Sequence, residues 1–148
     1  MSVPYKPSGY HTVTPYLVVQ NVPETVDFLR RAFGAEEREQ LTLPNGTVNH
    51  AMVLIGDSAI MLGLAPAADW SPVPSTFYVY VRDTDAVYRS ALAAGATSLT
   101  EPADQFYGDR NAGVRGPDGI RWWIATHVEE VPHAELLRRN AARAAKSR

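Results

Sequence analysis

The chain has 148 residues, which fits one domain of ordinary size with a buried core. Fourteen Lys and Arg residues oppose 16 Asp and Glu residues, so the net charge is −2, and an apolar fraction of 45% is typical of a globular protein. These values argue against a disordered chain, a collagen and a dedicated nucleic acid binder. The lack of cysteine excludes disulfide scaffolds, thiolate metal sites and cysteine nucleophiles.

The N-terminal segment shows no export signal. Residues 1–10 lack a basic stretch followed by an apolar core, and no apolar run approaches the roughly 20 residues of a membrane span. We therefore expect a cytoplasmic protein that does not bind membranes. Asn45-Gly46-Thr47 matches a glycosylation acceptor, but Pro44 before it makes a tight hairpin turn the better interpretation.

The first half of the chain predicts one strand, one helix and three more strands. Residues 14–19 have strand character, and Asn21 then caps a helix that Gly34 ends. The apolar stripe of that helix consists of Val22, Val26, Leu29 and Phe33. The three following strands are expected at roughly 37–43, 47–55 and 58–64.

The second half repeats this plan. A strand is expected over 76–81, and a helix follows that Asp83 or Thr84 caps and Gly95 ends. Its last three strands are expected at roughly 98–101, 112–115 and 121–125. Val19 corresponds to Val81 and Gly34 to Gly95, at offsets of 62 and 61 residues, so each half reads βαβββ.

These elements predict an α+β fold of two βαβββ modules in a single domain over residues 1–148. The predicted parts are module one at about 12–64, a proline-rich linker at 65–74, module two at about 75–128 and a basic tail at 133–148. Since a half of about 60 residues buries too little surface alone, we expect the sheets to associate, with helices outside and concave faces inward around a cleft. Strand alternation places Tyr16, Tyr78 and Tyr80 toward that cleft.

Short strings along both halves resemble one known family. They are Thr14-Pro-Tyr-Leu-Val-Val, Ala32-Phe-Gly-Ala-Glu, His50-Ala-Met, Ile55-Gly-Asp-Ser, Ala94-Gly-Ala, Asp104-Gln-Phe-Tyr-Gly-Asp-Arg110 and Trp123-Ile-Ala-Thr-His127. With the paired plan, they make residues 12 to about 130 similar to the vicinal oxygen chelate superfamily of glyoxalase I, extradiol dioxygenases, fosfomycin-resistance enzymes and bleomycin-resistance proteins. Within it the chain most resembles the PhnB-like branch.

The resemblance implies four metal-ligand positions, on the first and last strand of each module. They fall near Thr14, Met61, Thr76 and Trp123, none of which is a histidine or a carboxylate. Because divalent metals need imidazole, carboxylate or thiolate donors, we expect neither a bound metal nor another cofactor. A rearranged ligand set from His50, Glu101, Asp109 and His127 stays open as an alternative.

The candidate ligand-binding residues are aromatic, imidazole and loop side chains. They are Tyr16, His50, Tyr78, Tyr80, Gln105, Tyr107, Asp109, Arg110 and Trp123. The rings provide stacking surfaces, and Arg110 provides a planar fork for an anionic or carbonyl group that Asp109 orients. The alternatives are core packing for the rings, a satisfied semi-buried histidine for His50, and a structural Asp–Arg pair in the loop 105–110.

Residues near the C-terminus carry weaker predictions. His127 is expected to follow the last strand in a terminal polar patch with Glu129 and Glu130. The tail 133–148 has a charge of +4, which leaves −6 for the remainder of the chain. A solvated helix or a dimer strap explains this tail better than nucleic acid binding, since it lacks aromatic residues.

Three functions are consistent with these residues. The leading hypothesis is a homodimer without a metal that sequesters or carries a small organic ligand, as bleomycin-resistance proteins do. The alternative is an enzyme, either a lyase or isomerase with His50 and Arg110 as its catalytic residues, or a dioxygenase-type enzyme with a non-standard site. A third hypothesis is a regulatory or partner-binding module.

Overall fold

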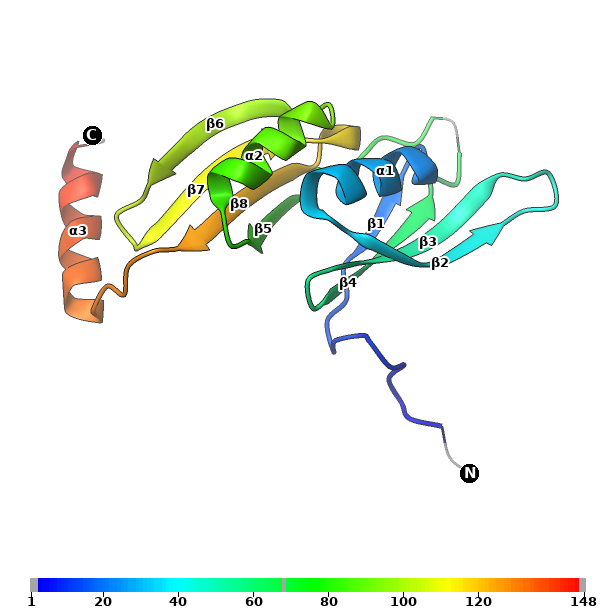
Figure 1. Cartoon of the computed structure of the whole chain (residues 1–148), viewed down its shortest axis with the longest axis horizontal. Helices are drawn as coiled ribbons and strands as arrows, with labels where there is room; N and C mark the ends of the chain where they lie inside the picture. Colours follow the sequence, from blue (N-terminus) through cyan, green and yellow to red (C-terminus); the bar gives the residue numbers. More distant parts are fainter. Residues whose placement is uncertain (1–2, 68, 147–148) are drawn as a thin grey trace.

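The computed structural model describes residues 3–67 and 69–146, and it confirms two βαβββ modules (Figure 1). Module one contains β1 (Tyr16–Val19), α1 (Val22–Phe33), β2 (Glu36–Thr42), β3 (Val48–Ile55) and β4 (Ser58–Leu64). Module two contains β5 (Thr76–Tyr80), α2 (Thr84–Ala93), β6 (Thr97–Asp104), β7 (Asp109–Arg115), the short 3-10 helix η1 (Pro117–Gly119) and β8 (Arg121–His127). A further helix, α3 (His133–Lys146), follows module two.

The two sheets have the same strand order. It is β1-β4-β3-β2 in the first sheet and β5-β8-β7-β6 in the second, and in each sheet only the first pair is parallel. Tyr16 pairs with Met61 across β1 and β4, and Tyr78 pairs with Trp123 across β5 and β8. The internal repeat of the sequence is therefore also a repeat in strand register.

Side-chain caps begin both module helices. Asn21 Oδ1 accepts a 2.9 Å hydrogen bond from the Glu24 N–H, and Asp83 Oδ1 accepts a 3.1 Å bond from the Ala86 N–H. Asp83 rather than Thr84 is thus the cap of α2. Gly34 ends α1 in the left-handed conformation, at a φ of 69°, which glycine adopts without strain.

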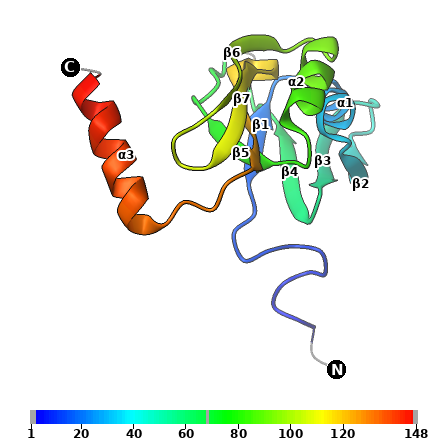
Figure 2. The same cartoon turned by 60° about the vertical axis from the view of Figure 1, so that its left-hand side comes forward.

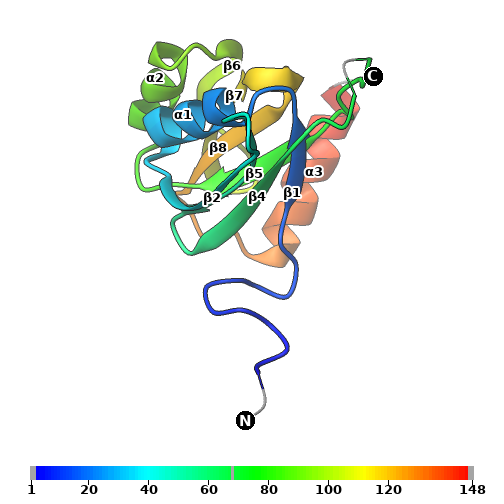
Figure 3. The same ribbon diagram turned by 90° about the vertical axis from the view of Figure 1, so that its right-hand side faces the viewer.

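The modules associate through their helices. Helix α1 covers one face of the first sheet, α2 covers one face of the second, and the two helices lie side by side (Figures 1 and 3). Trp122 is 1% exposed at this junction, where its ring lies 5.2 Å from that of Phe77 and 5.3 Å from that of Phe33. The expectation that both helices lie outside the associated sheets is therefore wrong, because each helix covers its own sheet and the modules meet at the helices.

The sheet faces opposite the helices, called the open faces below, stay accessible in the single chain. Tyr16 is 55% exposed, Tyr78 43% and Tyr80 64%. These rings do lie on the faces that strand alternation predicts, but a single chain does not enclose them.

Two strand boundaries differ from the prediction in ways that affect function. Strand β7 begins at Asp109, so Asp109 and Arg110 belong to a strand, and the turn before it comprises residues 105–108. Strand β8 continues to His127, which the sequence analysis wrongly placed after the strand. The cause is the extra pairing at this end, where Asp109 lies opposite His127.

Helix α3 stands apart from the two modules (Figure 2). It contains none of the buried residues in the described part of the chain. In residues 3–67 and 69–146, no helix is both long and apolar enough to cross a membrane.

Candidate functional site

A buried carboxylate lies on the open face of the second sheet, where β7 begins and β8 ends. Asp109 is 4% exposed, and its Oδ2 atom accepts hydrogen bonds from the hydroxyl groups of Tyr78, at 2.7 Å, and Tyr80, at 3.0 Å. Its Oδ1 atom lies 2.9 Å from Nδ1 of His127. Three strands therefore position the group: β7 carries the carboxylate, β5 the tyrosines and β8 the histidine.

The hydrogen bonds continue to Asn111 and Tyr107. Asn111 is buried, and its Nδ2 atom donates to the Tyr78 hydroxyl at 3.2 Å and to the Tyr107 hydroxyl at 2.6 Å. We call these six residues, Tyr78, Tyr80, Tyr107, Asp109, Asn111 and His127, the Asp109 cluster. Because their hydrogen bonds interlock, the cluster presents a prearranged polar surface between aromatic rings.

The cluster holds Asp109 ionised. Burial alone would raise the pKa of Asp109, but the hydrogen bonds from Tyr78, His127 and Tyr80 outweigh it and lower that pKa. Burial and the hydrogen bond to Asp109 raise the pKa of Tyr78. The pKa of Tyr80 is also raised, mainly by its own hydrogen bond to Asp109 and less by burial. Both phenols therefore remain protonated and direct their hydrogens at the carboxylate.

His127 is the ionisable partner of this carboxylate. Its bond to Asp109 is the main cause that raises the pKa of His127, and Glu130, whose Oε1 lies 3.2 Å from Nε2, adds to the effect. The protonated ring donates from both nitrogens to carboxylates. The arrangement can orient a ligand by hydrogen bonding, and the imidazole can also exchange a proton.

Arg110 lies on the opposite face from Asp109. Its Nε and Nη2 atoms donate to the two carboxylate oxygens of Asp85 in α2, at 2.7 and 2.9 Å, and Nη1 donates to Asp104 at 3.1 Å. The expected pairing between Arg110 and Asp109 is therefore wrong, because consecutive strand residues point to opposite faces. The alternative, that Arg110 forms a structural ion pair with an aspartate, is correct, but the partner is Asp85 and not Asp109.

The predicted residues of module one form a second, smaller group. The ring of Tyr16 lies 6.1 Å from that of His50, and it covers Gly63 so closely that a Cβ atom there would collide with the phenol. The side chain of His50 is 15% exposed, with Nε2 3.9 Å from Glu39 Oε1. The strand position of His50 corresponds to that of Asn111, since each pairs with the equivalent residue of the next strand, Gly63 or Ala125.

The remaining two predicted residues lie beside the Asp109 cluster. Trp123 is half-buried and rests on Gly113, where a Cβ atom would lie 2.8 Å from its ring. Gln105 donates its backbone N–H to the Asp109 carbonyl at 2.7 Å, and its side chain lines a hollow beneath α3. The turn of Gln105 thus fixes the start of β7.

A hollow of about 470 Å³ lies beside the free edge of β5, within the usual range for small-molecule sites. Tyr78, Tyr80 and Phe77 line one wall, and the turn from Gly56 to Ser58 lines the other. The hollow therefore connects the Asp109 cluster with the edge of module one.

The donor set does not fit the metal site that the fold family implies. Met61 lies beside Tyr16 and Trp123 beside Tyr78, and a thioether and an indole supply no adequate ligands for zinc or iron. In the described part of the chain, no three His, Cys, Asp or Glu residues gather closely enough to hold a metal ion. The rearranged set of His50, Glu101, Asp109 and His127 does not come together as a ligand group there.

The paired modules agree with comparisons to known proteins. The family model described as "Glyoxalase/Bleomycin resistance protein/Dioxygenase superfamily" matches residues 10–124. The chain belongs to this superfamily. It is 33% identical over 134 residues to the uncharacterised protein Mb0911c of Mycobacterium bovis, covering 84% of this chain and 88% of that relative.

Solved structures share the fold of this chain. TioX from Micromonospora sp. ML1 superposes with a TM-score of 0.69 at 24% identity, covering 80% of this chain and 99% of TioX. A glyoxalase/bleomycin resistance protein/dioxygenase from Nocardioides gives a TM-score of 0.59 at 20% identity, covering 84% of this chain and 88% of that one. These likenesses establish the fold, while the chemistry must come from the residues of this chain.

Sequence reasoning missed two members of the Asp109 cluster. Asn111 was not considered, and His127 was set aside as part of a terminal patch. Strand alternation carried the signal for Asn111, because a residue two positions after Asp109 shares its face. Detecting His127 required the register between β7 and β8, which the sequence does not specify.

Proposed function

We propose that this superfamily member is a cytoplasmic homodimer of the PhnB-like branch that binds a small organic ligand on its open faces without a resident metal. The observation that carries this proposal is the Asp109 cluster, a buried carboxylate whose charge organises two tyrosines and a histidine beside a hollow. Aromatic walls with a few convergent polar groups are typical of ligand sites.

The chemistry of the cluster favours ligands with hydrogen-bond donors. Tyr78 and Tyr80 commit their hydrogens to Asp109, so their oxygen lone pairs are what they offer outward. Their rings and that of Trp123 supply flat apolar surface. A planar molecule that carries amine or amide N–H groups fits these features.

The exposure of the aromatic rings is the reason that the proposal includes a second copy. Tyr16, Tyr78 and Tyr80 are 43–64% exposed in one chain, which is more aromatic surface than a monomer usually leaves to water. A second copy placed over the open faces would cover these rings and close the site around the ligand.

Titration with bleomycin and a panel of planar aromatic amines tests the binding function. Quenching of tryptophan fluorescence should saturate for at least one compound, and Asp109→Asn should weaken that binding by about tenfold or more, the scale of a lost charged hydrogen bond. Asp85→Asn, on the helix side of the same sheet, is the matched control and should bind normally. Saturable binding that Asp109→Asn leaves unchanged would contradict the proposal, and a flat response to the whole panel would favour the regulatory-module hypothesis.

Elemental analysis tests the metal-free state separately. Protein incubated with Zn²⁺, Ni²⁺, Fe²⁺ or Mn²⁺ and then desalted should retain none in stoichiometric amount, because the donor set is unsuitable. One equivalent of metal per chain would overturn this part of the proposal.

An enzymatic role is the second candidate, and the pairing of His127 with Asp109 is the observation that favours it. A histidine oriented by a buried carboxylate is a common general acid or base. Turnover of glyoxal adducts, catechols or fosfomycin that His127→Gln abolishes would establish an enzyme. The earlier pairing of His50 with Arg110 as catalytic residues has no geometric support, since Arg110 bonds Asp85 on the far face.

A further inference from the structure

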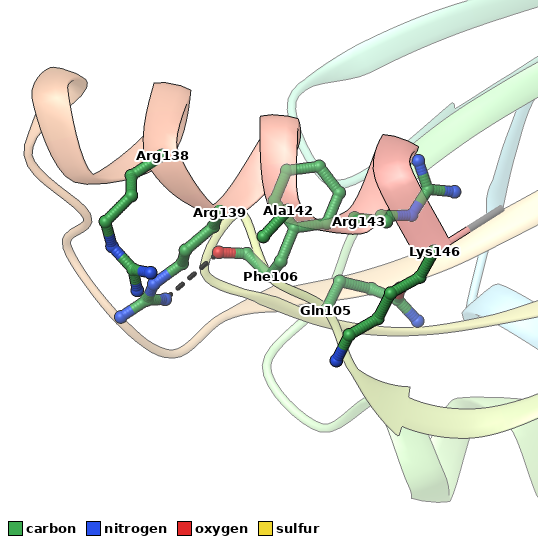
Figure 4. Close-up of a pocket in the computed structure, with 7 residues that line it drawn as sticks. All are labelled: Gln105, Phe106, Arg138, Arg139, Ala142, Arg143 and Lys146. Carbon is green, nitrogen blue, oxygen red and sulfur yellow. Dashed lines mark hydrogen bonds between the residues drawn. The ribbon is translucent and has the colours of Figure 1, made fainter. Parts of the chain in front are cut away.

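Helix α3 turns its charged side toward its own chain. Arg139 donates to the Phe106 carbonyl at 3.0 Å, and the Arg143 guanidinium lies 5.2 Å from the centre of the Phe106 ring (Figure 4). Arg139 also donates to both carboxylate oxygens of Glu129, at 3.0 Å. A hollow of about 430 Å³ separates this side from the turn at Gln105 and Phe106. Leu136 is partly buried on this side, and no side chain of α3 is fully buried, so the contacts that hold the helix against its own chain are mainly polar.

The apolar side of α3 faces away from its own chain. Leu137, Ala141 and Ala144 follow the i, i+4, i+7 spacing of one helix face, and Leu137 is 56% exposed. A 14-residue helix is marginal in water, and packing of its apolar face is what normally stabilises it. Because the apolar side of α3 points away from the chain, we infer that something outside the described chain covers this face.

A second copy of the chain offers a complementary surface at its opposite end. Helix α3 and the hairpin of β2 and β3 lie at the two ends of the long axis (Figure 1). On that hairpin Leu41 is 51% and Leu43 42% exposed, next to Glu37 and Glu39. A two-fold axis across the long axis brings each helix to the hairpin of the other copy.

The charges of the two surfaces are also complementary. The described helix has four basic side chains and one acidic one, a net charge of +3, whereas residues 36–39 of β2 carry three glutamates and one arginine, a net charge of −2. Opposite charges at the rim of an interface favour this pairing and disfavour two α3 helices packing together.

We propose that α3 is a strap that packs its Leu137 face on the β2–β3 hairpin of a second copy, against Leu41 and Leu43. This inference rests on the proposed homodimer and specifies its contact. The strap begins six residues after His127, so it would join the partner directly to the edge of the Asp109 cluster.

Cross-linking tests the contact cleanly because the chain has no cysteine. Equimolar Leu137→Cys and Leu41→Cys proteins, one of them tagged, are mixed, allowed to exchange and oxidised mildly. A disulfide-linked heterodimer is expected on a non-reducing gel. Ala142→Cys in place of Leu137→Cys is the matched control from the charged side of α3 and should cross-link poorly.

Sedimentation equilibrium supplies the second readout. Ala141→Asp should weaken the dimer by about tenfold or more, because it buries a charge in the contact, whereas Ala142→Asp on the charged side should not. A monomeric wild type overturns the homodimer and the strap together. The strap alone is overturned by a dimer that resists Ala141→Asp and forms no cross-link between Cys at positions 137 and 41. A dimer in which Leu137→Cys cross-links to itself also overturns the strap alone. The bleomycin titration tests the ligand proposal independently.

Discussion

Asp109 and Arg110 are adjacent in the chain, but their side chains bond on opposite faces of the second sheet. Asp109 accepts hydrogen bonds from Tyr78, Tyr80 and His127 on the open face, whereas Arg110 pairs with Asp85 of α2 on the helix face. One strand thus separates a carboxylate on the open face from an ion pair on the helix face. Variants on the two faces should therefore have different effects.

Arg110→Gln should leave ligand binding intact and slightly lower thermal stability. Its partner Asp85 is more than one-third exposed, as is Arg110 itself, so solvent screens the pair and its loss is mild. The thermal midpoint and the titration described above measure the two effects. A loss of binding with the fold intact would return Arg110 to the candidate site.

The pairing of Asp109 with His127 predicts a defined pH dependence. The folded state raises the pKa of His127 above 6.5, so the resulting stability is complete below pH 6.5 and is lost as the pH rises through the raised value. The pKa of Asp109 is lowered below 3.8, so its contribution is lost only as the pH falls through that lower value. The ion pair should therefore persist from below pH 3.8 to above pH 6.5.

NMR titration of the His127 ring checks this directly. In the wild type its pKa should lie above 6.5, and in Asp109→Asn it should fall. The thermal midpoint of His127→Gln should approach that of the wild type at alkaline pH. An unchanged His127 titration in Asp109→Asn would show that Glu130 dominates instead.

Whether a feature could be predicted from the sequence depends on how far apart in the chain the interacting residues are. Caps such as Asn21, turns such as Pro44-Asn45-Gly46, and the βαβββ repeat depend on neighbouring residues, so the sequence predicted them well. Tyr78 and Tyr80 were placed on the right face by alternation alone. The bond from Asp109 to His127 spans 18 residues and depends on strand register, which a turn at Gly116 to Gly119 sets and composition does not reveal.

The position of α1 against α2 was beyond sequence reasoning for a related reason. Both helices have an apolar stripe, and such a stripe indicates that it is buried but not what covers it. Only the assembled chain shows that Phe33 of α1 meets Trp122 of the other module.

Gly108 should tolerate no side chain. Its φ is +101°, and a Cβ atom would collide with the Glu129 carbonyl, while its own carbonyl accepts from the N–H groups of Val128, at 2.8 Å, and Glu129, at 3.0 Å. Gly108→Ala should cost about 1 kcal/mol or more of the free energy of unfolding, measured in urea. Because Gly108 precedes Asp109, the same variant should also weaken ligand binding. The control is Gly46→Ala, which should bind normally, because Gly46 also has a positive φ but lies in a hairpin with open space around it.

Trp122 and Trp123 are consecutive, and replacing each with alanine should separate stability from binding. Trp122 contacts Phe33 of module one, stacks on Phe77 of its own module and is 1% exposed, so Trp122→Ala should cost about 3–5 kcal/mol of the free energy of unfolding. Trp123 lies half-buried on the open face over Gly113, so Trp123→Ala should cost less and weaken ligand binding more. Urea denaturation and fluorescence titration of both variants decide the matter, and equal losses of stability would contradict the assignment of Trp122 to the junction between the modules.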